Sequence, residues 1–195
     1  MPATINLRDH LTDCVVFLQE FLKHPHQVGS VIPSSRFLER RIVELADIAA
    51  ARTVVELGSG TGGTTRALLG AMSPDARLLS MEINPKFCEL IERIDDARLI
   101  VHEGYAQTLP DALALYGLPA PDAIVSGIPF STMGREVGAL IIQSIAATLS
   151  TGGRFVAYQV SGTVAELTSP VLGTPRFEVE SLNIPPMRLY RWDKQ

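Results

Sequence analysis

The sequence predicts an α/β protein built on a mostly parallel sheet with one antiparallel strand. From residue 52 onward, short apolar segments typical of buried strands alternate with longer segments of helical periodicity. A glycine-rich turn, residues 58–63, connects the first strand to the helix after it. The last two strand segments are separated only by a short Pro-containing turn, which indicates an antiparallel pair. We therefore expect seven strands with helices on both faces of the sheet.

Length and composition indicate an ordered, globular protein. The 195 residues are 46% hydrophobic and 19% charged, and the net charge of −4 argues against a nucleic-acid partner. Only Cys14 and Cys88 occur, with no secretory signal layout and no apolar run of bilayer length. We expect a cytoplasmic protein with no transmembrane segment. Its expected division is N-terminal helices in residues 1–50 and one compact unit in residues 51–195.

The N-terminal extension contains one amphipathic segment. Residues 5–24 place apolar side chains at helical spacing, which allows two roles: packing on the domain, or lying on a membrane surface or over an acyl chain. The loop that follows contains His24 and His26. No further His or Cys cluster accompanies them, so we expect no metal site.

The remaining elements follow in order along the chain. Ser34 or Ser35 is expected to cap a helix that runs to about Ala50, with Glu39 within reach of a capping box. The expected strands are residues 52–57, 77–83, 98–102, 122–126, 154–160, 177–182 and 187–192, and the expected later helices are residues 62–71, 85–94 and 133–149.

The glycine turn is the expected ligand site, because glycine allows close approach to the main chain and the next helix offers free N–H groups. One motif, Gly58-x-Gly60-x-x-Gly63, fits dinucleotide binding. A second, Glu56-x-Gly58-x-Gly60-x-Gly62, resembles the first motif of class I S-adenosylmethionine (SAM) methyltransferases. A pyrophosphate has little use for a carboxylate at the strand tip, whereas an ammonium and a sulfonium tolerate it. The sequence therefore favours SAM.

Two further strand ends are expected at the same edge of the sheet. Glu82 follows Gly62 by 20 residues, where a carboxylate can accept both ribose hydroxyls; the alternative is a surface acid at a strand end. The segment 126–130 follows the fourth strand. Because ligands of open α/β sheets bind beyond the strand carboxyl ends, this segment is expected to face the reacting methyl group.

Residues 50–195 resemble the class I SAM-dependent methyltransferases, which have a Rossmann-like fold. The chain is more closely similar to the bacterial phospholipid N-methyltransferases, a group similar to the rRNA adenine dimethyltransferases. The segments that carry this resemblance are residues 21–25, 28–35, 54–63, 126–130 and 183–186. Gly127 stands where the rRNA enzymes have an Asn that grips the adenine amine, which favours an amine outside nucleic acid.

The resemblance implies methylation of a phospholipid amine head group, such as that of phosphatidylethanolamine, at a membrane surface, with residues 5–35 as a lid. The protein is then peripheral on the inner membrane face. The cofactor-binding residues are expected to be Glu56, Gly58, Ser59, Gly60, Thr61, Gly62, Glu82, Ile83, Gly104, Tyr105, Ala106 and Ser126. The substrate-binding residues are expected to be Ile32, Pro33, Ser34, Arg36, Pro129 and Phe130.

The catalytic positions are expected to be Ser126 and Gly127, whose backbone carbonyls orient the amine, and Tyr105. Tyr105 stands where many relatives have an acid that binds the adenine amino group. Its ring packs on adenine, or that contact passes to the backbone or to Gln107. Tyr105, His24 and His26 are also candidate proton acceptors.

Other interpretations stay open at this point. Arg36, Arg40 and Arg41 either hold a lipid phosphate or form a solvated helix face. The rival functions are an NAD-dependent oxidoreductase, a methyltransferase for rRNA or a soluble metabolite, and a non-catalytic SAM-binding module whose N-terminal helix is a dimer contact.

Overall fold

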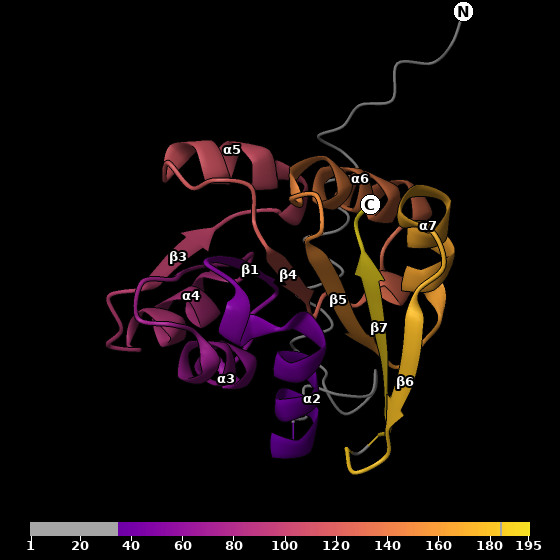
Figure 1. Ribbon diagram of the computed structural model, residues 1–195, viewed down its shortest axis with the longest axis horizontal. Helices are drawn as coiled ribbons and strands as arrows, with labels where there is room; N and C mark the ends of the chain where they lie inside the picture. Colours follow the sequence, from indigo (N-terminus) through magenta and orange to yellow (C-terminus); the bar gives the residue numbers. More distant parts are fainter. Residues whose placement is uncertain (1–34, 184) are drawn as a thin grey trace, which may run out of the picture.

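The computed structural model describes residues 35–183 and 185–195, in which seven strands form one sheet in the order β3-β2-β1-β4-β5-β7-β6 (Figure 1). β7 is antiparallel to β5 and β6, and the other neighbouring strands are parallel, which confirms the predicted fold class. The strands are β1 (Thr53–Leu57), β2 (Arg77–Glu82), β3 (Leu99–Glu103), β4 (Ala123–Ser126), β5 (Arg154–Gln159), β6 (Arg176–Glu180) and β7 (Met187–Asp193).

Helices cover both faces of this sheet (Figure 1). The α-helices are α2 (Arg36–Ala46), α3 (Gly63–Ala71), α4 (Pro85–Glu92), α5 (Leu109–Leu115), α6 (Arg135–Thr148) and α7 (Thr163–Leu172). Three 3₁₀ turns complete the described elements: η1 (Ile48–Ala50), η2 (Ala106–Thr108) and η3 (Phe130–Thr132).

The central strand β1 shows why the sheet must be covered on both sides. All five of its residues are buried. Val54 packs with α2 and α3, whereas Val55 packs with α5, α6 and α7, because successive side chains of a strand point to opposite faces. A strand that is apolar on both faces is typical of a parallel sheet between two helical layers.

Helix α2 begins as predicted but ends early. The Ser35 hydroxyl accepts a hydrogen bond from the Leu38 N–H at 3.2 Å, so Ser35 is the N-cap. The expected continuous helix to Ala50 is wrong: Asp47 adopts a left-handed conformation with φ 52°, which stops α2 before the separate turn η1. The expected capping box is also absent, because Glu39 lies one residue too far along and the Ser35 N–H donates to Asn183 Oδ1 at 3.0 Å instead.

Two helices were not predicted. Helix α5 is only seven residues long, and α7 contains Pro170 within the helix, so neither shows a long periodic segment. Both nevertheless bury apolar side chains in the core on the α6 side of the sheet, among them Leu109 in α5 and Val164 in α7.

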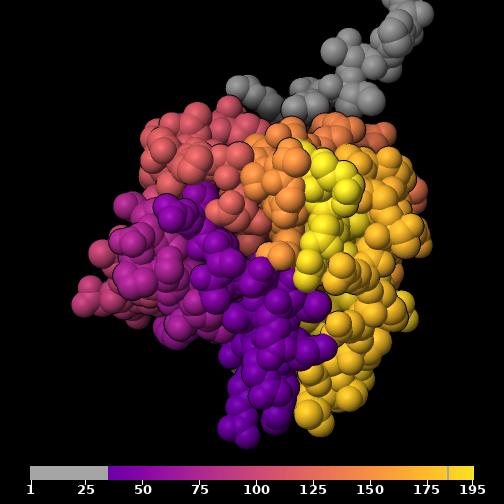
Figure 2. Space-filling model, viewed as in Figure 1, coloured from indigo at the N-terminus to yellow at the C-terminus, as the bar shows by residue number. Residues whose placement is uncertain are grey.

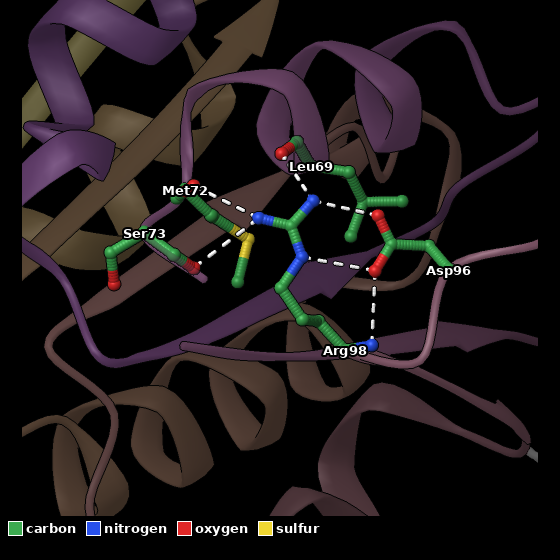
Figure 3. A network of polar contacts seen from close by, with 5 residues as sticks. All are labelled: Leu69, Met72, Ser73, Asp96 and Arg98. Atoms are coloured by element: carbon green, nitrogen blue, oxygen red, sulfur yellow. Dashed lines mark hydrogen bonds and ion pairs between the residues drawn. The ribbon is translucent and has the colours of Figure 1, made fainter. Parts of the chain in front are cut away.

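Arg98 joins the end of α3 to the start of β3 (Figure 3). Its guanidinium donates to the carbonyls of Leu69, Met72 and Ser73 at 2.8–3.2 Å, which satisfies the free carbonyls at the helix end. It also donates to both carboxylate oxygens of Asp96 at 2.6 and 2.9 Å. All three guanidinium nitrogens of Arg98 and both carboxylate oxygens of Asp96 therefore have partners.

Helix α2 also lies beside the β6–β7 pair. In Figure 2 the indigo surface of α2 adjoins the yellow surface of β6 and β7. The Arg41 guanidinium in α2 forms an ion pair with Glu178 in β6. Among residues 35–183 and 185–195, no helix combines the length and apolarity needed to cross a membrane. The expected amphipathic helix in residues 5–24 lies outside the described residues.

Candidate functional site at the carboxyl ends of the central strands

The turn after β1 has the backbone that its glycines predict. Gly58, Gly60 and Gly62 have φ values of 80°, 53° and 84°, a left-handed region that other residues adopt only with strain. The turn is held by hydrogen bonds from the Gly58 N–H to the Met81 carbonyl (2.8 Å) and from the Gly62 N–H to the Ser59 carbonyl (3.0 Å). Alternating glycines are therefore a requirement of this turn.

Glu82 connects the turn to the ends of β2 and β3. One carboxylate oxygen accepts from the Gly60 N–H at 3.0 Å, and the other accepts from the N–H groups of Ile83 and Asn84, each at 2.9 Å. The Glu82 carbonyl accepts from the Gly104 N–H at 2.9 Å. The structure thus brings together four residues predicted at the cofactor site, and Glu82 is a buried part of it rather than a surface acid.

Glu56 lies beneath the same turn, pointing toward α3. Its side chain is fully buried, and one carboxylate oxygen accepts from the hydroxyls of Thr65 (2.7 Å) and Ser80 (2.8 Å). The other oxygen, Oε1, has no partner within the described part of the chain. Burial raises the pKa of Glu56 to about 7, against the lowering effect of the two hydroxyls. A direct contact of Glu56 with cofactor stays a prediction.

The space next to the turn is open on one side. A side chain at Gly60 would meet no atom within 4 Å. The Ser59 hydroxyl is buried and has no hydrogen-bond partner among the residues described, while Thr61 is exposed. Buried polar atoms in native proteins are nearly always paired, so an unpaired hydroxyl beside an open turn indicates a place for a polar ligand.

The segment after β4 forms a second turn against the first. The Gly127 N–H donates to the Leu57 carbonyl at 3.0 Å, and the buried Ser126 hydroxyl accepts from the Ile128 N–H at 3.3 Å. Gln159, at the end of β5, holds this turn: its amide donates to the Ile128 carbonyl at 2.6 Å and accepts from the Phe130 N–H at 3.3 Å. Gln159 is itself buried.

Tyr158 precedes Gln159 in β5, so its side chain points to the other face of the sheet. From there it reaches the turns after β1 and β4. A Cβ atom at Gly127 would lie 2.3 Å from the Tyr158 hydroxyl oxygen, so the missing side chain of Gly127 makes room for the phenol. The same hydroxyl lies 3.3 Å from the Thr64 hydroxyl in the first turn of α3. The Tyr158 phenol therefore lies against Gly127, whose carbonyl is predicted to orient the reacting amine.

Other predicted residues lie elsewhere or play different parts. The Phe130 ring packs in the core, so only its backbone belongs to the turn. The Arg36 guanidinium lies over the Phe37 ring, 5.2 Å from its centroid, and Arg40 and Arg41 each face Glu44. Ile32, Pro33 and Ser34, together with His24 and His26, lie outside the described residues.

The loop after β3 lies at the same edge as Glu82. Tyr105 is half-buried, and its carbonyl accepts from the N–H and the hydroxyl of Thr108 at 2.9 and 2.8 Å. Ala106 is buried at the start of η2. Within the described ranges, no group of three or more His, Cys, Asp or Glu side chains is placed to hold a metal ion.

Sequence reasoning missed the contribution of β5 to the site. Tyr158 and Gln159 are polar residues at the carboxyl end of a parallel strand, and that position is the signal that points to them. Thr65 and Ser80 were missed as well. Ser80 stands opposite Glu56 in the β1–β2 register, which the sequence does not reveal without the pairing.

The chain is similar in sequence to enzymes of two kinds. It is 33% identical over 147 residues to an ornithine lipid N-methyltransferase of Singulisphaera acidiphila, a match that covers 74% of this chain and 77% of that protein. It is 34% identical over 96 residues to a ribosomal RNA small subunit methyltransferase A of Phenylobacterium zucineum, which covers 48% of this chain but only 32% of that protein. No protein-family model matches the chain.

Solved structures share the fold at low sequence identity. A 1,6-didemethyltoxoflavin-N1-methyltransferase of Burkholderia thailandensis, solved with S-adenosylhomocysteine, has a TM-score of 0.70 at 15% identity, covering 100% of this chain and 93% of that one. The N-methyltransferase NodS of Bradyrhizobium japonicum, also with S-adenosylhomocysteine, has a TM-score of 0.66 at 15% identity, covering 91% and 98%.

Proposed function

The chain belongs to the class I SAM-dependent methyltransferases, and from this we propose that it methylates the primary amine of a membrane lipid head group. One observation carries the proposal: the match to the ornithine lipid enzyme extends over about three quarters of both chains, whereas the match to the rRNA enzyme spans about a third of that protein. Ornithine lipid and phosphatidylethanolamine both offer such an amine.

The cofactor is SAM, and the residues present fit it. The turn at Gly58–Gly62 has open space at Gly60, and the Ser59 hydroxyl and Glu56 Oε1 are buried without partners in the described chain. We assign Glu82 to the ribose, since its Oε2 accepts only from the Gly60 N–H and keeps a second lone pair for a hydroxyl, whereas Oε1 already accepts from both Ile83 and Asn84. The loop Gly104–Ala106 is assigned to the adenine.

Bound SAM supplies an electrophilic methyl group: the amine lone pair forms the new nitrogen–carbon bond as the carbon–sulfur bond breaks and its electron pair stays on sulfur. The amine must first be neutral, and desolvation at the site lowers its pKa. The Ile128 carbonyl is already bound by Gln159, and we assign the carbonyls of Ser126 and Gly127 to orient the amine. One proton is released per methyl transferred.

A lipid acceptor requires the protein to approach a membrane from one side. We propose a peripheral association at the cytoplasmic face, with residues 5–35 as the lid that contacts lipid. An amphipathic segment with an apolar face buries that face among acyl chains without crossing the bilayer. Arg36, exposed at the start of α2, is then near the lid and available to a lipid phosphate.

The proposal is tested with vesicles of phosphatidylglycerol that contain ornithine lipid, phosphatidylethanolamine or neither. The protein is incubated with methyl-labelled SAM, and lipid extracts are measured by mass spectrometry. We expect label in one of the two amine lipids and none in phosphatidylglycerol alone. Absence of label from both amine lipids would contradict the proposal, and the labelled lipid identifies the head group.

A small-subunit rRNA transcript in the same assay tests the second candidate, which the shorter rRNA match favours. Label in the transcript alone would assign the chain to rRNA. A soluble acceptor, ornithine methyl ester, tests whether the amine is accepted without a membrane.

A further inference from the structure

We propose that the Tyr158 hydroxyl is a catalytic group that accepts a hydrogen bond from the N–H of the acceptor amine at the tip of β4. The inference deepens the proposed function and rests on it. It assigns a contact to β5, whereas the sequence pointed to the backbone carbonyls after β4 and to Tyr105, His24 and His26.

The first observation is steric. The ideal Cβ position at Gly127 lies 2.3 Å from the Tyr158 hydroxyl oxygen and 2.8 Å from the ring carbon that bears it. Any side chain at residue 127 would therefore displace the phenol. The same Cβ position is 3.1 Å from the Gly58 carbonyl, so the hydroxyl lies where the β1 and β4 turns meet.

The second observation is the set of groups that face this hydroxyl. From α3, the Thr64 hydroxyl lies 3.3 Å away, and either oxygen can donate. Burial raises the pKa of the Tyr158 phenol far above its ordinary value, and the carboxylates of Glu56, Glu39 and Glu82 raise it further. The phenol thus stays protonated, and when it donates to Thr64 its oxygen lone pairs are available to an N–H donor.

The third observation is the sign of the surroundings. The carboxylates of Glu56 on β1, Glu82 on β2 and Glu39 on α2 all raise the pKa of this phenol. Methylation of a neutral amine leaves a positive charge on nitrogen. Negative groups around the reacting nitrogen stabilise that developing charge.

The test compares Tyr158→Phe with wild type in the full chain. Ornithine lipid and phosphatidylethanolamine vesicles and soluble ornithine methyl ester are the acceptors, each at saturating SAM. We expect kcat/KM for the accepted amine to fall about tenfold or more, because one hydrogen bond to the reacting nitrogen is lost. SAM affinity by calorimetry is expected to stay within about twofold. Urea unfolding checks that the variant folds.

Tyr190→Phe is the matched control, because this buried tyrosine packs on Trp192 away from both turns and is expected to leave kcat/KM unchanged. Unchanged kcat/KM in a folded Tyr158→Phe protein would overturn the inference alone. A tenfold weaker SAM affinity with normal turnover would also overturn it and assign Tyr158 to the cofactor. Wild-type protein that methylates none of the amines would overturn both the inference and the proposed function.

Discussion

Two acidic residues of this molecule, Asp96 and Glu56, differ in their hydrogen-bond partners and in the direction in which their pKa values are shifted. Asp96 lies at the entry to β3, where the Arg98 side chain and backbone N–H donate to its oxygens (Figure 3). Those hydrogen bonds lower the pKa of Asp96 to about 2. Glu56 is buried under the glycine turn with only two hydroxyl donors on one oxygen, and burial raises its pKa to about 7.

The difference separates a structural acid from a candidate functional one. Both carboxylate oxygens of Asp96 accept hydrogen bonds from Arg98, so the protein itself pairs this acid. Glu56 keeps one acceptor oxygen, Oε1, without a partner in the described chain, although leaving a buried acceptor unpaired costs about 1–3 kcal/mol. Acidic residues with strongly shifted pKa values concentrate at functional sites, because catalysis or binding requires an environment that destabilises the folded protein.

The largest expected effect is on the pH dependence of stability. The pKa of Glu56 is raised on folding, so the folded state keeps its proton longer, and its contribution to the free energy of unfolding falls as pH rises from 4.5 to about 7. A shift of this size corresponds to about 3 kcal/mol. Urea titrations should show the stability of Glu56→Gln relative to wild type rising by that order across the window.

Asp96→Asn is the control for this experiment, and its sign is opposite. The pKa of Asp96 is lowered on folding, so its contribution is present above pH 3.8 and is lost as pH falls toward 2. Its stability relative to wild type should stay flat between pH 4.5 and 7. A flat profile for Glu56→Gln as well would show that the Glu56 carboxyl is not protonated in the folded protein.

The next effect is on cofactor affinity. Glu82→Gln introduces an NH₂ group opposite the backbone N–H donors of Gly60 or of Ile83 and Asn84 and weakens the ribose contact. We expect calorimetry to show about 100-fold weaker SAM binding, or about 2.7 kcal/mol. Glu103→Gln, an exposed residue opposite Glu82 on β3, is the matched control. Equal SAM affinity in the two variants would remove Glu82 from the cofactor site.

A smaller effect is expected for the turn after β4. Gln159→Met keeps the side-chain size but removes the side-chain partner of the Ile128 carbonyl and the Phe130 N–H, which keep only their hydrogen bond to each other at 3.0 Å. We expect kcat to fall about tenfold with little change in SAM affinity, because the carbonyls that orient the amine lose their support. Gln143→Met, on the exposed side of α6, should behave as wild type. A parallel loss of SAM affinity would contradict a role in positioning the acceptor.

The smallest effect is expected for the hydrogen-bond network of Arg98 at the end of α3. Arg98→Met leaves three carbonyls at the end of α3 to water and Asp96 without its partner. We expect a loss of about 1 kcal/mol, or roughly 2–4 °C in Tm for a domain of this size, and unchanged SAM affinity. Arg93→Met, an exposed neighbour, is the control. Weaker SAM binding in Arg98→Met would show that the two regions are coupled.

The sequence predicted the sheet better than the helices around it. Apolar segments such as Val54–Leu57 carry the period and the buried character of central strands, and the final pair signalled its antiparallel direction. Helix α7 was missed because Pro170 and several β-branched or hydroxyl residues lack a helical pattern, and tertiary packing decides it. The break at Asp47 depends on a single left-handed residue that no motif announces.

The sequence pointed to those parts of the candidate site that lie within one continuous segment. The spacing of Glu56 and the glycines pointed to the β1 turn, and the distance to Glu82 pointed to the β2 end. Tyr158 and Gln159 were missed, because their place depends on β5 lying next to β4 and on the direction of each side chain. The spare oxygen of Glu56 likewise depends on Thr65 and Ser80, which a motif does not specify.

The strand order has a consequence for synthesis on the ribosome. Within the described residues β6 pairs with β7 alone, yet β7 comes later in the chain and must first pair with the free edge of β5. During synthesis the segment Arg176–Glu180 therefore has no strand to pair with until β7 is in place. The side chains of Phe177 and Val179 are about half exposed even in the folded protein. An unpaired strand of this kind can pair wrongly with another molecule while the chain is still being synthesised. We therefore expect a chaperone to bind the nascent chain at this segment.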